Sequence, residues 1–203
     1  MENRVSAMTV AEKTGQRFAL GFAGKTLPPE FRRLVKEYKA GNVILFRENL
    51  ESASQARRLT DEIRALIGEE TGFPPFIALD QEGGVVTRLP GDMVNVPGAM
   101  ALAAAGDSRA VYEAARITAG ELERIGVNLN LAPVLDVNSN PDNPVIGVRS
   151  FGSKPELAAA LGARAVQAYA DAGLLCCGKH FPGHGDTATD SHLDLPRVDK
   201  DLA

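Results

Sequence analysis

The sequence has no tryptophan, and of its 203 residues only two are cysteine and three are histidine. The cysteines, Cys176 and Cys177, are adjacent, and a disulfide between neighbours would be strained, so we expect two buried free thiols. The longest apolar stretch, around residues 99–105, is far shorter than the roughly 20 residues of a membrane span. Because the N-terminus also lacks a signal-peptide pattern, we expect a cytoplasmic protein with no membrane partner.

An excess of charge of either sign is also missing. Lysine and arginine total 22, aspartate and glutamate total 26, and the two signs are interspersed along the chain. A nucleic-acid partner normally requires a basic patch, so none is expected. Hydrophobic residues make up 44% of the sequence, which is enough for a substantial core. No linker or low-complexity segment interrupts residues 1–203, so we expect a single domain.

Short apolar runs alternate with amphipathic stretches along the chain. The expected strands are Phe18–Phe22, Val43–Phe46, Phe76–Leu79, Leu129–Val137 (bent by Pro133) and Leu174–Cys177. Alternation of this kind predicts an α/β fold with a parallel sheet and helices packed outside it. By length, five strands suit an open doubly wound sheet, whereas a complete (β/α)₈ barrel takes about 250 residues.

Helix signals lie between these runs. We expect helices from Ser52 or Ser54 to Ile67, from Asp107 or Ser108 to Ile125, and from Ser153 to residues 171–173. The final residues, RVDKDLA (197–203), resemble the start of another helix.

The segment ALGFAGKT (19–26) fits a relaxed phosphate-loop pattern. A phosphate loop needs a helix that begins at its Lys-Ser/Thr pair, so that backbone N–H groups surround the phosphate. Leu27-Pro28-Pro29 follows here and prevents such a helix, and the first glycine of the motif is missing. We therefore reject nucleotide binding.

Charged residues follow three of the expected strands. Asp80 ends the third, Asp136 lies at the end of the fourth, and the fifth continues into Lys179-His180. Ligands of α/β proteins bind at the carboxyl ends of parallel strands. This placement predicts a ligand site at that edge.

All three histidines lie on one loop, KHFPGHGDTATDSH (179–192). Candidate metal ligands are His180, His184 and His192 with Asp186, Asp190 and Asp194, although their spacing matches no common metal motif. The histidines could instead hydrogen-bond loop carbonyls and serve structure alone. A third alternative is acid–base catalysis, in which the carboxylate of Asp190 orients the His192 imidazole and favours its protonated form.

The segment KHFPGHGDTATDSHLDLP resembles the signature of glycoside hydrolase family 3, in its bacterial β-N-acetylglucosaminidase branch that recycles cell-wall sugars. The segments LDQEGGVVTRL (79–89), NLNLAPVLDV (128–137) and VIGVRSFG (145–152) are similar to that branch in the same order. The resemblance covers nearly the whole chain. It implies a TIM-type (β/α)₈ barrel, of which about the first five strand–helix units are present.

The resemblance also implies roles for individual residues. His192 is the implied general acid/base, and Asp190 is its orienting partner. The residues implied to hold N-acetylglucosamine are Asp80, Arg88, Arg149, Lys179 and His180. Asp136 is a candidate for stabilising the loops around the site. No metal and no cofactor are expected.

The implied function is that of a retaining exo-β-N-acetylglucosaminidase acting on peptidoglycan-derived muropeptides or related glycosides. The alternatives are a β-N-acetylglucosaminide phosphorylase, a non-catalytic sugar-binding fragment and a metal-binding scaffold. In this family the nucleophile is an Asp on a later strand, and no residue of this chain matches its motif. We therefore expect this polypeptide alone to show little or no hydrolase activity and, because its barrel edges are unpaired, to be either oligomeric or poorly folded.

Overall fold

A computed structural model describes residues 4–198 of the chain. The described residues form two compact units. The first unit contains the chain up to Asp80 together with Arg88–Val94 and Glu121–Asn130. The second contains Gln81–Thr87, Asn95–Gly120 and the chain from Leu131 onward. Each unit is therefore assembled from segments that are distant in sequence.

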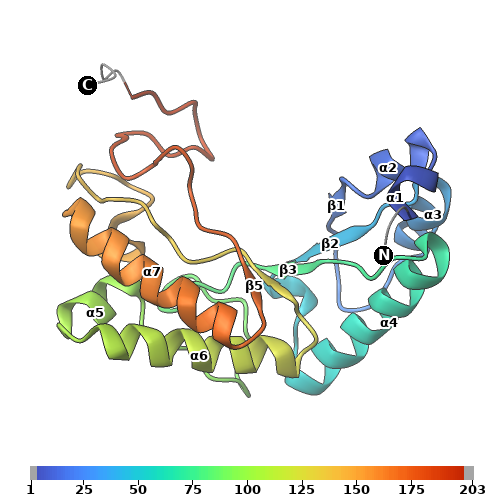
Figure 1. Cartoon of the computed structure of the whole chain (residues 1–203), viewed down its shortest axis with the longest axis horizontal. Helices are drawn as coiled ribbons and strands as arrows, with labels where there is room; N and C mark the ends of the chain where they lie inside the picture. Colours follow the sequence, from blue (N-terminus) through green and yellow to red (C-terminus); the bar gives the residue numbers. More distant parts are fainter. Residues whose placement is uncertain (1–3, 199–203) are drawn as a thin grey trace. The chain divides into compact units, whose positions relative to one another are not determined.

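Strands and helices alternate along the chain (Figure 1). The strands are β1 (Ala19–Leu20), β2 (Asn42–Leu45), β3 (Ile77–Leu79), β4 (Leu129–Asn130) and β5 (Leu175–Cys176). The α-helices are α1 (Arg4–Ala7), α2 (Val10–Gly15), α3 (Pro29–Tyr38), α4 (Ala53–Thr71), α5 (Ala99–Ala104), α6 (Ser108–Arg124) and α7 (Pro155–Asp171). Two 3-10 turns, η1 (Arg47–Asn49) and η2 (Gly147–Arg149), complete the set. The α/β fold class and a strand that overlaps each of the five expected segments are confirmed.

The sheet of the first unit is parallel and follows chain order from β1 to β4. In its centre Val43 pairs with Ile77, and Leu45 pairs with Leu79. These four side chains are fully buried. Residues two positions apart in a strand point to the same face, so these side chains form one buried face of the sheet.

Helix α4 forms where the sequence predicts it, because its signals are local. The Ser52 side chain accepts a hydrogen bond from the Gln55 backbone N–H, which makes Ser52 rather than Ser54 the N-cap. The apolar residues of its buried stripe are Ala56, Leu59, Ile63 and Ile67. The helix ends at Gly72, whose φ of 73° is left-handed and suits glycine.

In the second unit, the chain after β4 runs parallel to the chain after β5. Val134 and Lys179 form an isolated parallel bridge, and the Leu135 N–H donates to the Lys179 carbonyl at 2.7 Å. Helices α6 and α7 lie alongside each other (Figure 1), and the Tyr112 hydroxyl donates to Asp171 at 2.7 Å between them. The paired segments bring two polar strand ends together, at Asp136 and Lys179.

Several expectations about the elements are corrected. The regular strand β4 ends at Asn130 rather than Val137, and beyond Pro133 the pairing is reduced to the isolated bridge between Val134 and Lys179. Helix α7 begins at Pro155 with Lys154 as N-cap and no capping side chain, so Ser153 does not cap it. Cys176 is half-buried and Cys177 is exposed; both are free thiols but not buried ones.

Four helices of the described residues were not expected from the sequence, namely α1, α2, α3 and α5. Helix α3 begins at Pro29, which suits the first turn of a helix. No helix begins at Lys25-Thr26, in agreement with the rejection of a phosphate loop. None of the helices in residues 4–198 has the length and apolar character needed to cross a bilayer.

Three expectations about the fold remain untested, and one of them is the single domain over residues 1–203. Most of the helix expected over 197–203 lies outside the described residues, which end at 198. Self-association stays a prediction.

The core of the first unit makes a testable prediction about stability. Ile63 is fully buried in α4, so Ile63→Ala should lower the free energy of unfolding by about 2–5 kcal/mol in a urea titration. Ile117 on α6 is 47% exposed, so Ile117→Ala serves as the matched control and should cost at most about 1 kcal/mol. Equal losses for the two variants would contradict the described burial of α4.

Candidate active site

The polar side chains of the candidate site all belong to the second unit. Glu82 lies in a tight turn after β3, Asp136 ends the segment after β4, and Lys179 ends the segment after β5. The turn at Glu82 depends on Gly83 and Gly84, which have φ angles of 90° and 56°. A Cβ at Gly84 would lie 2.8 Å from the Gly98 Cα, so only glycine fits there.

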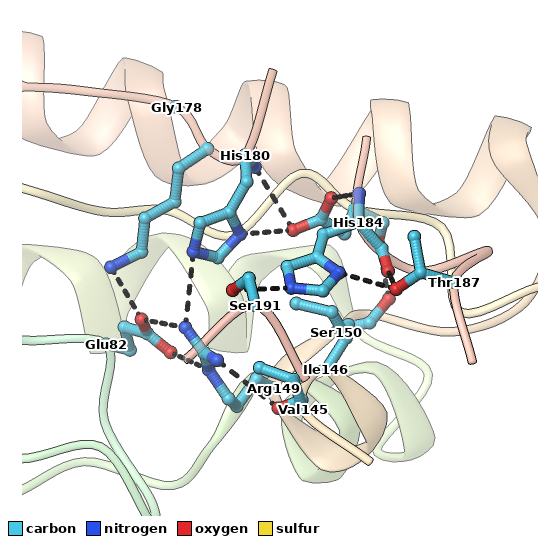
Figure 2. Close-up of polar contacts among 12 residues, drawn as sticks. Glu82, Val145, Ile146, Arg149, Ser150, Gly178, His180, His184, Thr187 and Ser191 are labelled. Atoms are coloured by element: carbon cyan, nitrogen blue, oxygen red, sulfur yellow. Dashed lines mark hydrogen bonds and ion pairs between the residues drawn. The ribbon is translucent and has the colours of Figure 1, made fainter. Parts of the chain in front are cut away.

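A buried carboxylate joins two of the predicted sugar-binding residues (Figure 2). Glu82 accepts two hydrogen bonds from Arg149, from Nε and Nη2, both at 2.8 Å. Glu82 also forms an ion pair with Lys179 Nζ at 2.6 Å. The Glu82 side chain is only 5% exposed. Burial raises the pKa of the Glu82 carboxyl, but the hydrogen bonds from Arg149 and Lys179 outweigh it and lower the pKa below its ordinary value. Glu82 is therefore ionised and fixes both cations.

A second buried carboxylate organises the histidine loop. Asp136 accepts from His180 through Nδ1 at 2.6 Å and through the backbone N–H at 3.1 Å. It also accepts from the His184 backbone N–H at 2.6 Å. Burial raises the pKa of Asp136, but the hydrogen bonds from His180 and His184 more than offset it and lower the pKa. This is the arrangement expected of a residue that stabilises the loops around a site.

The two carboxylates are linked through His180. His180 Nδ1 lies 2.6 Å from Asp136 Oδ2, and its Nε2 lies 3.4 Å from Arg149 Nη2 (Figure 2). A hollow of about 500 Å³ opens beside Lys179 and His180, with Leu135 in its wall. Three predicted sugar-binding residues, Arg149, Lys179 and His180, are thus brought together.

The predicted acid–base pair forms on the exposed part of the same loop. Asp190 accepts from His192 Nδ1 at 2.7 Å and from the His192 backbone N–H at 2.8 Å. Both bonds lower the pKa of Asp190, and the bond from the His192 backbone N–H has the larger effect. The His192 side chain is 78% exposed, which leaves its Nε2 accessible to a reacting molecule. The arrangement can deliver and accept a proton.

His184 differs from the other two histidines because it is buried. Its Nδ1 lies 2.7 Å from Thr187 Oγ1, and its Nε2 lies 3.0 Å from Ser191 Oγ. Its carbonyl accepts from Asn143 Nδ2 at 2.7 Å. Within residues 4–198, no three His, Cys, Asp or Glu side chains are placed so that they could hold a metal ion.

The sequence profile of the glycosyl hydrolase family 3 N-terminal domain matches residues 9–203. The chain belongs to glycosyl hydrolase family 3.

Relatives and solved structures agree with this family. The chain is 39% identical to beta-hexosaminidase A of Pseudoalteromonas piscicida, over 96% of this chain and 36% of that protein. It is 42% identical to a beta-hexosaminidase of Alkalilimnicola ehrlichii, over 88% of this chain and 51% of that protein. A family 3 beta-N-acetylglucosaminidase from Paenibacillus sp. superposes with a TM-score of 0.92 at 48% identity, covering 95% of this chain and 36% of that one.

NagZ from Neisseria gonorrhoeae, solved with N-trifluoroacetyl-D-glucosamine, superposes with a TM-score of 0.80 at 36% identity. That alignment covers 90% of this chain and 54% of the other. The chain thus spans about a third to a half of the length of these relatives. The likeness to family 3 structures agrees with the expected barrel-type α/β fold, of which the chain supplies the N-terminal part.

Two predicted site residues of the family 3 chain lie in the first unit. Asp80 directly follows β3, as expected, and is half-buried. Arg88 belongs to the segment Arg88–Val94 and is also half-buried. Their sugar-binding roles stay predictions.

Glu82 is the residue that sequence reasoning missed. It stands two positions after Asp80 in the DQEGG motif, and only Asp80 was singled out there. The available signal was the pair of glycines after Glu82, since a tight turn next to an acidic residue marks a position held for its geometry.

The lowered pKa of Asp136 predicts how stability depends on pH. A folded-state pKa below the ordinary 3.8 stabilises the fold above about pH 4, and this contribution is lost as the pH falls through the folded-state value. Between about pH 4 and pH 2, the free energy of unfolding should therefore fall less in Asp136→Asn than in the wild type. Urea titrations at each pH measure this difference. Asp142→Asn, at an exposed loop position, is the control. The same acid dependence in Asp136→Asn as in wild type would contradict the role assigned to Asp136.

Proposed function

We propose that this chain forms the sugar-holding and proton-transferring part of a retaining exo-β-N-acetylglucosaminidase. The relatives named beta-hexosaminidase and beta-N-acetylglucosaminidase support the reaction class. The observation that carries the proposal is the hydrogen-bonded pair of Asp190 and the exposed His192, on the loop that begins with Lys179 and His180. One loop thereby contributes both to holding a sugar and to moving a proton.

The sugar is held by the donors that Glu82 fixes. Arg149 and Lys179 each carry more N–H groups than Glu82 uses, so they can also donate to hydroxyl and acetamido oxygens. His180 presents Nε2 beside them. Because Glu82 neutralises part of the positive charge, the site suits a neutral sugar. The NagZ complex with N-trifluoroacetyl-D-glucosamine supports the same ligand class.

His192 acts as the acid/base. Asp190 accepts the proton on Nδ1 and holds the imidazole in one orientation, so that Nε2 carries the proton that is transferred. In the first step of a retaining mechanism His192 protonates the leaving oxygen, and in the second it deprotonates the attacking water. The nucleophile is not assigned to a residue of this chain.

The use of a histidine as the acid/base indicates which leaving group the enzyme accepts and in which compartment it works. Most glycosidases use a carboxylic acid at this position. An imidazole repels an anionic leaving group less than a carboxylate does, which suits the carboxylate-bearing muramic sugar of peptidoglycan fragments. Recycling of such fragments in the cytoplasm is the setting that we propose.

The proposal predicts how the acid/base pair responds to substitution. In the whole protein, His192→Ala should lower kcat/KM for a poor alkyl leaving group by about 100-fold or more, since a general acid contributes about that much. The loss should shrink for an activated aryl N-acetylglucosaminide, which needs little protonation. Asp190→Asn should act in the same direction, and Asp194→Asn, two residues beyond the loop, is its control.

Two results would contradict the proposal. Unchanged activity of His192→Ala toward the poor leaving group would remove the acid/base role. Release of N-acetylglucosaminyl phosphate in place of free sugar when phosphate is added would show a phosphorylase instead.

A further inference from the structure

His184 is a buried imidazole that the proposed reaction does not use. His184 is only 8% exposed, and both of its ring nitrogens have hydrogen-bond partners within its own loop. One of these partners, Ser191, lies between the two members of the acid–base pair, Asp190 and His192. His184 therefore touches the centre of the segment that carries the pair.

The inner end of this contact is held on several sides. The His184 backbone N–H donates to the fully buried Asp136 side chain, and its carbonyl accepts from Asn143. The Thr187 hydroxyl donates to the same carbonyl at 3.0 Å. The outer end has far less support, because Ser191 and His192 are both exposed. The bond from His184 Nε2 to Ser191 Oγ thus joins a fixed residue to an exposed one (Figure 2).

The directions of these bonds follow from the donors available. Because the Thr187 hydroxyl gives its hydrogen to the His184 carbonyl, its oxygen accepts from His184 Nδ1–H. In the tautomer with its hydrogen on Nδ1, His184 has a lone pair on Nε2, which accepts the hydrogen of the Ser191 hydroxyl. Ser191 is therefore the donor in the bond that holds the exposed segment.

The same carboxylate also fixes the sugar-binding end of the loop. Asp136 Oδ1 accepts from the His184 backbone, while Oδ2 accepts from both nitrogen donors of His180. One buried group thus sets the position of the sugar-binding His180 and of the imidazole that holds Ser191.

We propose that His184 is a positioning residue: it holds the Asp190–Ser191–His192 segment through the Ser191 hydroxyl and keeps His192 at a fixed place relative to His180. This inference rests on the proposed function only for its effect on catalysis. The hydrogen bond itself is testable without activity.

The first test measures the bond directly. Ser191→Ala removes the donor at an exposed position, so the fold is retained. Backbone amides of residues 189–193 should then exchange with deuterium about fivefold faster, as for the loss of one hydrogen bond. The ¹⁵N resonance of His184 Nε2 should move, while that of His180 stays in place. Ser191→Thr, which keeps the hydroxyl, should restore both values, and Ser153→Ala, at another exposed loop position, is the control.

The second test measures catalysis in the whole protein. Ser191→Ala should lower kcat for a poor leaving group by about tenfold, since misplacing an acid by a fraction of an ångström has effects of this order, while KM stays unchanged. Ser191→Thr should recover the loss.

The outcomes separate the two proposals. Wild-type exchange rates and an unmoved His184 resonance in Ser191→Ala would overturn the positioning role, whatever the activity. If exchange rises but kcat for the poor leaving group is unaffected, the bond exists and the positioning role is wrong. Full activity of His192→Ala would overturn the proposed function while leaving the hydrogen bond in place.

Discussion

The arrangement of the site depends on the buried Glu82 carboxylate. Two cations on different segments, Arg149 and Lys179, would repel each other if they lay together without a counter-charge. Glu82 lies between them, accepts hydrogen bonds from both and is itself kept ionised by them. Its position follows from the glycine turn at Gly83 and Gly84. A local backbone feature thereby places the two donors for which we propose a sugar-binding role.

From this cluster outward, the site becomes progressively more exposed. Asp136 has no exposed side-chain surface and holds both His180 and His184. The segment beyond them ends in Asp190 and the largely exposed His192. Such a gradient suits the two tasks assigned to the loop, because binding a sugar favours fixed donors, whereas a proton carrier must reach a leaving group and later a water molecule.

Several locally encoded features were predicted from the sequence, although the locally capped α2 was missed, and contacts between distant segments were not predicted. The α4 helix follows from Ser52 and its apolar stripe, and the Asp190–His192 pair joins residues only two positions apart. The resemblance in the motifs identified the family. Glu82 escaped notice because its partner Arg149 lies 67 residues away, and nothing near Glu82 in the sequence shows that contact. Strand ends and the exposure of Cys177 likewise depend on which neighbours a segment meets.

The central claim is that Glu82 holds Arg149 and Lys179 as one sugar-binding unit, and calorimetric titration with N-acetylglucosamine tests it most directly. Circular dichroism would first establish that Glu82→Gln and Glu82→Asp keep the fold. Glu82→Gln should raise the dissociation constant about tenfold or more, Glu82→Asp should have a smaller effect, and Glu69→Gln, at an exposed position of α4, should have none. Binding by Glu82→Gln as tight as that of the wild-type chain would contradict this claim.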